Sequence, residues 1–187
     1  MSLYFKRQLA DYVEYHRDPW NGVMHVFGII SLFLAAMLPL SLWPVPGLGG
    51  QITLAPLLAV PVLVYWMLLD AALGTAILGA AVILLVSAAA IVTRMSIVGV
   101  WSITAVLIIA GVTFQVVGHS VFERRKASMA DNPTHLLLGP LFVMAKLFIA
   151  FGFRSDLAAI ITPAQRLTNL AAQPYRAEAQ GEPLQLS

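Results

Sequence analysis

Four long runs of apolar residues, separated by short polar breaks, occupy the middle of this 187-residue chain. Each run is close to the roughly 20 residues that an α-helix needs to cross a bilayer. The pattern therefore predicts four membrane-spanning helices, at residues 23–43, 53–69, 71–93 and 96–117. Asp18 followed by Pro19 is typical of a helix start, so we expect the first helix to begin close to this pair.

The third run carries small residues at four-residue spacing, at Ala72, Ala76 and Ala80. Residues four apart lie on the same face of a helix, and small side chains let helices approach closely in lipid. We expect this face to pack against a neighbouring helix.

A fifth apolar segment, residues 134–153, is interrupted by Pro140 and Lys146. A lysine at the centre of a spanning helix costs about 2.5–3.5 kcal/mol on insertion scales. We therefore expect this segment to be re-entrant or interfacial rather than spanning.

The two ends of the chain are more polar than its middle. Phe5, Leu9 and Tyr12 are helically spaced within the first 21 residues, which predicts an amphipathic helix lying on the membrane surface. Residues 154–187 are rich in Ala, Gln and Pro and are predicted to form a partly disordered tail, with one short helix starting at Thr162. Residues 1–153 then form the membrane-embedded domain.

Composition places the chain among integral membrane proteins of the all-α class, as a polytopic helical bundle. Hydrophobic residues make up 59% of the chain and charged residues only 11%, far from the balance of a soluble domain. The only charged residues between Trp20 and Gly118 are Asp70 and Arg94. The net charge of +2 offers no basic patch to a nucleic acid. The absence of Cys excludes disulfides and thiolate metal ligands.

The basic residues predict an orientation in the membrane. If four helices span and the fifth segment does not, ten of the eleven Lys and Arg residues lie on one side, and Arg94 lies opposite. The positive-inside rule then places both termini and the tail in the cytoplasm. We expect a bacterial inner membrane, with the endoplasmic reticulum as the alternative.

All four histidines of the chain fall at one membrane face in this topology, which makes them candidate metal ligands. They are His16, His25, His119 and His135. His119 leaves the fourth run, and on a continuing α-helix Glu123 shares its face four residues later, so that an imidazole and a carboxylate able to hold a metal converge. The alternative is that the histidines are interfacial residues bonded to lipid headgroups.

Two motifs resemble a known family. Residues 15–25 read YHRDPWNGVMH, and residues 115–126 read QVVGHSVFERRK. Together with residues 131–132 and 139–143, they resemble the small membrane dioxygenases that shorten 2-hydroxy fatty acids by one carbon, in lipid and sphingoid-base breakdown. The resemblance covers roughly residues 10 to 150. The family usually has Pro-Ala where this chain has Ala127-Ser128, a difference that affects the shape of a loop.

The resemblance implies an Fe(II)-dependent oxidoreductase that uses O₂ and a 2-hydroxy fatty acid, with residues 1–153 as its catalytic domain. It implies a ligand set of His16, His25, His119 and His135. Neutral imidazoles suit iron, and open coordination positions would let the 2-hydroxyl and carboxylate of the substrate chelate beside O₂. Nothing in the sequence specifies an oligomeric state, and the lipid bilayer is the one further partner.

Two further residues, Glu123 and Asn21, are candidates for a role in catalysis. Glu123 either completes a set of two histidines and one carboxylate or orients an imidazole N–H. It could otherwise form a surface ion pair with Arg124 or Lys126, which would contribute little. Asn21 is either a hydrogen-bond donor beside a ligand or simply a residue that starts a helix.

Two other classes of protein compete with the dioxygenase. A small transporter or channel needs polar residues deep inside several spans, whereas the mid-span positions here are nearly all Ala, Leu, Ile and Val. A non-catalytic membrane scaffold or lipid-binding protein fits the composition equally well. Metal content separates this scaffold from the enzyme.

Overall fold

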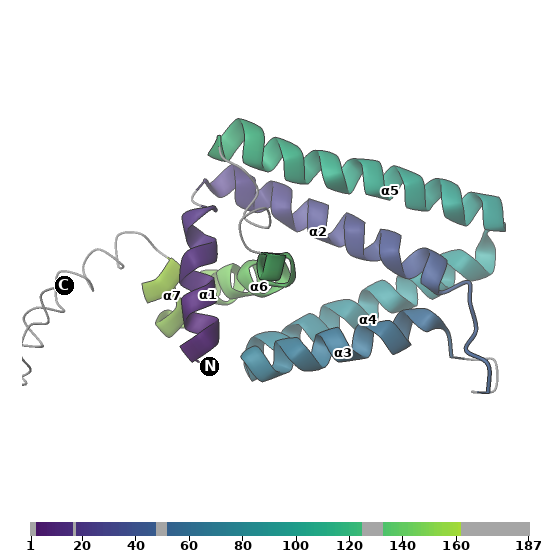
Figure 1. The fold of residues 1–187 in the computed structure, drawn as a ribbon, viewed down its shortest axis with the longest axis horizontal. Helices are drawn as coiled ribbons and strands as arrows, with labels where there is room; N and C mark the ends of the chain where they lie inside the picture. The colour runs from purple at the N-terminus through teal and green to yellow at the C-terminus, as the bar shows by residue number, and fades with distance from the viewer. Residues whose placement is uncertain (1–2, 17, 48–51, 125–132, 162–187) are drawn as a thin grey trace, which may run out of the picture. The chain divides into compact units, whose positions relative to one another are not determined.

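The structure is a computed structural model that describes residues 3–16, 18–47, 52–124 and 133–161. Every regular element in these ranges is a helix, which confirms the all-α class (Figure 1). The helices are α1 (Leu3–Glu14), α2 (Pro19–Leu40), α3 (Leu54–Leu69), α4 (Ala71–Arg94), α5 (Ile97–Val117), η1 (Gly118–Glu123), η3 (Pro133–Leu137), α6 (Gly139–Ala150) and α7 (Ser155–Ile161). The chain divides into two compact units, residues 1–144 and 145–187.

Three helices within the described ranges are long and apolar enough to cross a membrane. They are α2, α4 and the continuous run Ile97–Glu123, which joins α5 to η1. The second predicted span corresponds to α3, which has only 16 residues, and α6 has 12. The chain is therefore a membrane protein by the length and composition of its helices, and a fourth crossing stays a prediction.

Polar side chains mark the helix starts. The Asp18 carboxylate accepts hydrogen bonds from the backbone N–H groups of Trp20 and Asn21 at 2.7 and 3.3 Å, with Pro19 in the first turn of α2. This confirms the predicted helix start. Asp70 and Ser96 cap α4 and α5 in the same way. Such caps satisfy N–H groups that the first turn of a helix leaves without partners.

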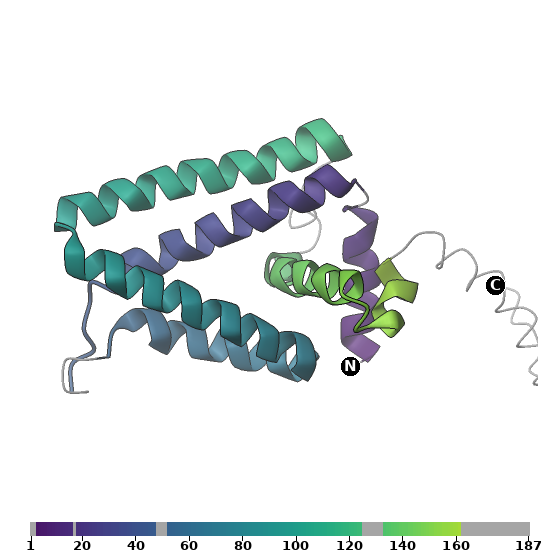
Figure 2. The ribbon, with the colours of Figure 1, turned by 180° about the vertical axis from the view of Figure 1, so that it is seen from behind.

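Helices α2 and α5 run side by side along their length (Figures 1 and 2). Glycines permit this close approach. A Cβ atom added to Gly111 would lie 2.6 Å from Leu32 Cγ and 3.2 Å from the carbonyl oxygen of Gly28. Packing of this kind, rather than hydrophobicity, holds helices together in lipid.

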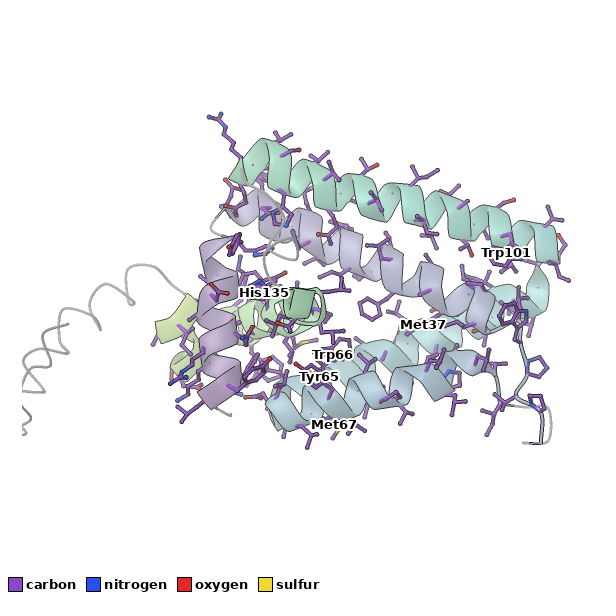
Figure 3. All side chains as sticks on the ribbon, in the orientation of Figure 1. Met37, Tyr65, Trp66, Met67, Trp101 and His135 are labelled. Atoms are coloured by element: carbon purple, nitrogen blue, oxygen red, sulfur yellow. The ribbon has the colours of Figure 1, made fainter. Side chains whose placement is uncertain are left out.

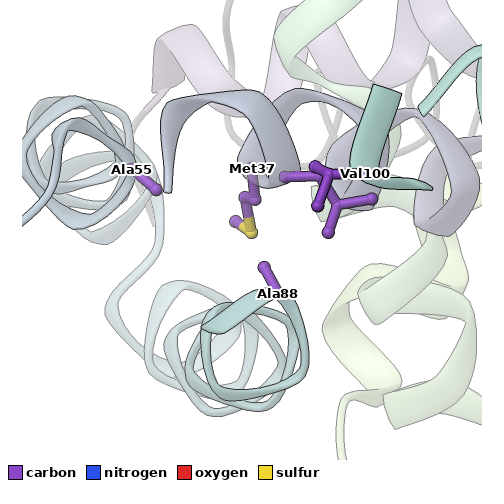
Figure 4. Packing of buried hydrophobic residues seen from close by; sticks show 5 residues of the cluster. Met37, Ala55, Ala88 and Val100 are labelled. Atoms are coloured by element: carbon purple, nitrogen blue, oxygen red, sulfur yellow. The ribbon is translucent and has the colours of Figure 1, made fainter. Parts of the chain in front are cut away.

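The far ends of these two helices meet α3 and α4 in an apolar cluster. Met37 lies among Ala55, Ala88 and Val100, so that one side chain from α2 contacts residues of three other helices (Figure 4). Small partners leave room for the long, adaptable methionine. This cluster fixes the end of the bundle opposite the four histidines.

The small-residue face predicted for the third run is not the face that packs. Ala72 and Ala80 are exposed, whereas Leu73, Gly74 and Ile77 are buried. The reason is Gly74, because a Cβ atom there would lie only 2.6 Å from the Cα atom of Met67. The backbones of α3 and α4 touch at this glycine, and the alanines turn outward.

Helix α1 is amphipathic as predicted, but its apolar face is buried in the protein. Phe5, Leu9 and Tyr12 are all almost fully buried, and the Tyr12 ring packs against Phe142 with centroids 5.1 Å apart. Its apolar face thus packs against protein side chains, and the location of the helix at the membrane surface stays a prediction.

The predicted tail contains a helix that the sequence did not predict. It is α7, in whose first turn Asp156 forms an ion pair with Arg154, with N···O distances of 2.7 and 2.8 Å. The guanidinium holds the pKa of Asp156 below its usual range. The predicted features at Arg17, at residues 125–132 and from Thr162 onward lie outside the described residues. The domain boundary after residue 153 stays a prediction.

We expect Gly74→Ala to destabilise the protein and Gly79→Ala to leave it unchanged. The first substitution pushes a methyl group into the backbone of α3, and such overpacking costs about 1–3 kcal/mol. Gly79, on the same helix, has no neighbouring atom within 4 Å of an added Cβ. Thermal unfolding in detergent measures both. Equal melting temperatures for the two variants would show that α3 and α4 do not touch at Gly74.

Candidate metal centre

Three buried histidines from different parts of the chain meet at one end of α2 and α5. His16 follows α1, His25 lies in the second turn of α2, and His119 lies in η1. One ligand nitrogen from each lies within 4.8 Å of the other two. The three rings stand nearly perpendicular to one another, with centroids 4.5 to 5.0 Å apart. Among the described residues this is a geometry that a single metal ion can bridge.

Hydrogen bonds to the backbone fix which nitrogen of two rings faces the centre. His16 Nδ1 lies 2.9 Å from the Tyr12 carbonyl oxygen, and His25 Nδ1 lies 3.1 Å from that of Asn21. A carbonyl oxygen only accepts, so each Nδ1 carries its hydrogen and each Nε2 of a neutral ring presents a lone pair. Metal-binding histidines are held in this way in general.

The two Nε2 atoms face each other at 3.0 Å. Two lone pairs at this distance repel unless a proton or a metal ion lies between them. The third ring also contributes a nitrogen that a cation could bind, because His119 Nδ1 is buried without a hydrogen-bond partner among the described residues. Buried polar atoms are nearly always satisfied in proteins. The donor set therefore fits a cation.

The helix that carries His119 has an unexpected register. Gly118–Glu123 is a π-helix, in which backbone hydrogen bonds run from residue i to i+5 and side chains are spaced differently from those of an α-helix. The α-helical register assumed for His119 and Glu123 is therefore wrong. His119 points into the group of three histidines, and Glu123 is not among the ligand atoms that lie together there.

Glu123 instead holds the first turn of α2. Its Oε1 atom accepts hydrogen bonds from the backbone N–H of Asp18 at 2.7 Å and from Asn21 Nδ2 at 3.1 Å. The Asn21 carbonyl in turn accepts the Nδ1–H of His25. Both residues singled out beside the histidines thus belong to one chain of contacts that ends at a ring of the centre.

His135 lies in the same region but outside the group of three. Its ring packs edge to face with that of Tyr12, with centroids 5.4 Å apart, and its Nε2 lies 3.2 Å from Asp11 Oδ2. Burial lowers the pKa of His135, and the Asp11 carboxylate partly offsets this effect. Its Nδ1 atom is buried and has no hydrogen-bond partner among the described residues.

Tyr12 packs against the rings of both His16 and His135. Its ring is stacked on that of His16, with centroids 3.9 Å apart and planes 9° apart. Burial raises the pKa of the Tyr12 phenol, so the side chain stays neutral. From the sequence, Tyr12 is predicted only to lie on the apolar face of the first helix. No residue spacing indicated that its ring stacks on His16.

A cavity of about 660 Å³ opens beside the centre. Its size is in the range of pockets that hold small organic ligands. Its walls come from α1, α2, α5, η1, η3 and the start of α6, and they include His25, His119 and His135. Most of the remaining wall is apolar; its described members include Ile29, Leu32, Phe33, Ala36, Val112 and Leu136.

One wall of the cavity is tied to the α3–α4 hairpin. Trp66 of α3, labelled in Figure 3, donates its indole N–H to the Leu137 carbonyl oxygen at 2.7 Å, and its ring centroid lies 5.9 Å from that of Phe33. Leu137 and Phe33 both line the cavity. The contact spans 71 residues of sequence, and no motif pointed to it.

Comparisons with known proteins agree with this picture. The model of a family described as "2-hydroxy-palmitic acid dioxygenase Mpo1-like" matches residues 2–151, and the chain belongs to this family. The chain is 29% identical over 162 residues to the 2-hydroxy-palmitic acid dioxygenase MPO1 of Saccharomyces cerevisiae, covering 83% of this chain and 86% of the yeast protein. No solved structure matches the chain.

We expect Glu123→Gln to keep the stability of the protein and Glu123→Leu to lower it. Glutamine retains the oxygen that accepts from Asp18 and Asn21, whereas leucine leaves two donors without their partner. A buried donor without a partner costs about 1–3 kcal/mol. Thermal unfolding in detergent measures the difference. If both variants lost the same stability, the charge of Glu123 rather than its accepting oxygen would hold α2.

Proposed function

We propose that this chain is an iron-dependent dioxygenase that shortens 2-hydroxy fatty acids by one carbon, in lipid and sphingoid-base breakdown. The observation that carries the proposal is the pair of imidazole Nε2 atoms facing each other at 3.0 Å beside His119. This group opens into an apolar cavity, in a member of a family described by a 2-hydroxy acid dioxygenase.

The donor set supports iron as the metal. Neutral imidazole nitrogens suit Fe(II) and several other transition metals, and the chain has no Cys to favour softer ions. His16, His25 and His119 would hold the ion. We keep His135 as a fourth ligand through its unpartnered Nδ1 atom, because its Nε2 faces a carboxylate, as is common for metal-binding histidines.

A ferrous ion bound there would supply the activation of O₂. The chain itself positions the ligands: the Tyr12 and Asn21 carbonyls hold the rings of His16 and His25, and Glu123 holds Asn21. Asn21 and Glu123 therefore act through His25, and neither is a metal ligand in this proposal.

The cavity suits the acyl chain of the substrate. An acyl chain needs an apolar channel, and the walls between α2 and α5 provide one that starts at the histidines. Burial of each CH₂ group contributes about 0.8 kcal/mol, so the acyl chain of the fatty acid, rather than its carboxylate and hydroxyl, supplies most of the binding affinity. A reaction that consumes one O₂ and one 2-hydroxy acid balances with the shortened acid, CO₂ and water.

We further propose four crossings, with α3 as the short second span and residues 134–153 re-entrant or interfacial. Both termini then face the cytoplasm, of a bacterial inner membrane or, alternatively, of the endoplasmic reticulum. The support is the charge distribution, with ten of eleven basic residues on one side.

Purified protein should contain about one iron per chain, since one group of histidines is proposed to bind it. A chelator should abolish oxygen uptake on 2-hydroxypalmitic acid, and Fe(II) should restore it. Elemental analysis and an oxygen electrode provide the two measurements. Zinc in place of iron, without oxygen uptake, would reject the dioxygenase and favour a non-catalytic lipid-binding protein or scaffold.

The matched variants for this experiment are His119→Ala and Glu123→Gln. His119→Ala removes a nitrogen that no neighbour can replace, so iron and oxygen uptake should both be lost. Glu123→Gln should keep its iron but turn over more slowly, because loss of a group that orients a ligand costs about 10–100-fold. Full iron and activity in His119→Ala would leave the histidines as merely interfacial residues.

Cysteine labelling tests the orientation, and the chain is suited to it because it has no native Cys. We expect Lys6→Cys and Ser155→Cys to react only from the cytoplasmic side and Ser96→Cys only from the opposite side. If Ser155→Cys instead reacted together with Ser96→Cys, residues 134–153 would span the membrane.

A further inference from the structure

The polar side chains of the cavity are concentrated at its histidine end, with one exception further along α5. Gln115 lines the cavity four residues before His119, which places it about 6 Å deeper along the helix axis at 1.5 Å per residue. Its described neighbours in the wall, Ile29, Leu32 and Val112, are apolar. Gln115 thus stands at the boundary between the polar end and the apolar channel.

The fold makes room for this side chain. A Cβ atom at Gly28 of α2 would lie 2.8 Å from Gln115 Nε2 and 3.1 Å from its Cγ. The glycine therefore accommodates the glutamine side chain at the α2–α5 contact. No hydrogen bond joins the Gln115 amide to any residue in the described parts of the chain.

The Gln115 side chain is half-buried in this wall, and an amide beside apolar groups is stabilised by a hydrogen-bond partner. It offers one acceptor oxygen and two N–H donors. A hydroxyl group both donates and accepts, so it can pair with either end of the amide, whereas a carboxylate can only accept. Among the described residues of the wall none carries a formal charge, which leaves the carboxylate to the metal end.

We propose that Gln115 determines specificity by hydrogen bonding the 2-hydroxyl group of the fatty acid. This inference rests on the proposed function and names the contact that distinguishes a 2-hydroxy acid from an unsubstituted one. If the carboxylate lies at the histidines and the acyl chain follows α2, the 2-hydroxyl beside the carboxylate would donate its hydrogen to the Gln115 amide oxygen.

Such a contact selects its substrate because the analogue without the hydroxyl leaves the amide unpaired. Sites built to bond a substrate hydroxyl reject the analogue that lacks it far more strongly than apolar pockets reject a missing methylene. The apolar channel alone would bind both acids alike.

The test compares Gln115→Met with the unaltered protein, both iron-loaded and in detergent. Methionine has nearly the same length and shape and no amide. Dissociation constants are measured without O₂ for 2-hydroxypalmitic acid and for palmitic acid. The 2-hydroxy acid should bind about tenfold more weakly to the variant, as expected for one lost hydrogen bond. The affinity for palmitic acid should stay the same or rise.

The control is Ser102→Ala, since Ser102 is exposed on the same helix and donates to the Val98 carbonyl at 2.9 Å. It should leave both constants unchanged. If Gln115→Met does not fold, Gln115→Leu replaces it. Equal weakening of both acids, or no weakening of either, would overturn the inference.

Failure of the proposed function has a different signature in the same experiment. A protein that binds the 2-hydroxy acid preferentially through Gln115, yet never consumes O₂, would refute the dioxygenase and keep the contact. A protein that consumes O₂ while Gln115→Met retains full selectivity would refute the contact and keep the dioxygenase.

Discussion

The contact between α2 and α5 is the constraint on which the centre depends. Lipid provides no hydrophobic force between helices, so close packing must hold them. Gly28 and Gly111 bring the two backbones near enough for Gly28's carbonyl to lie 3.2 Å from the Cβ position of Gly111. One of these helices carries His25 and the other leads into His119. A side chain larger than glycine at the contact would separate the two imidazoles as well as the helices.

Hydrogen bonds to the local backbone orient the rings of His16 and His25. His16 and His25 each bond the carbonyl oxygen four residues earlier, a partner that is available wherever a helix or helical turn precedes the ring. These backbone contacts fix the orientation of both rings, and the two Nε2 atoms face each other at 3.0 Å.

The sequence predicted those features that depend on neighbours in the chain. The Asp18 cap and the apolar runs behind α2, α4 and α5 are local, and so is the clustering of histidines at helix ends. The register of η1 could not be predicted, because a π-helix persists only where tertiary contacts favour it over the α-helix. The hydrogen bond from Trp66 to Leu137 and the exposure of Ala72 likewise depend on contacts between different helices.

Tyr12 explains how the candidate metal centre and the apolar cavity share one wall. Its face is stacked on His16, its ring lies against His135 and Phe142, and it lines the cavity. An aromatic ring is apolar enough to border an acyl chain and rigid enough to support an imidazole. Because the phenol also remains neutral, it adds no charge beside the ligands. A ligand in the cavity would therefore contact the same side chain that is stacked on His16.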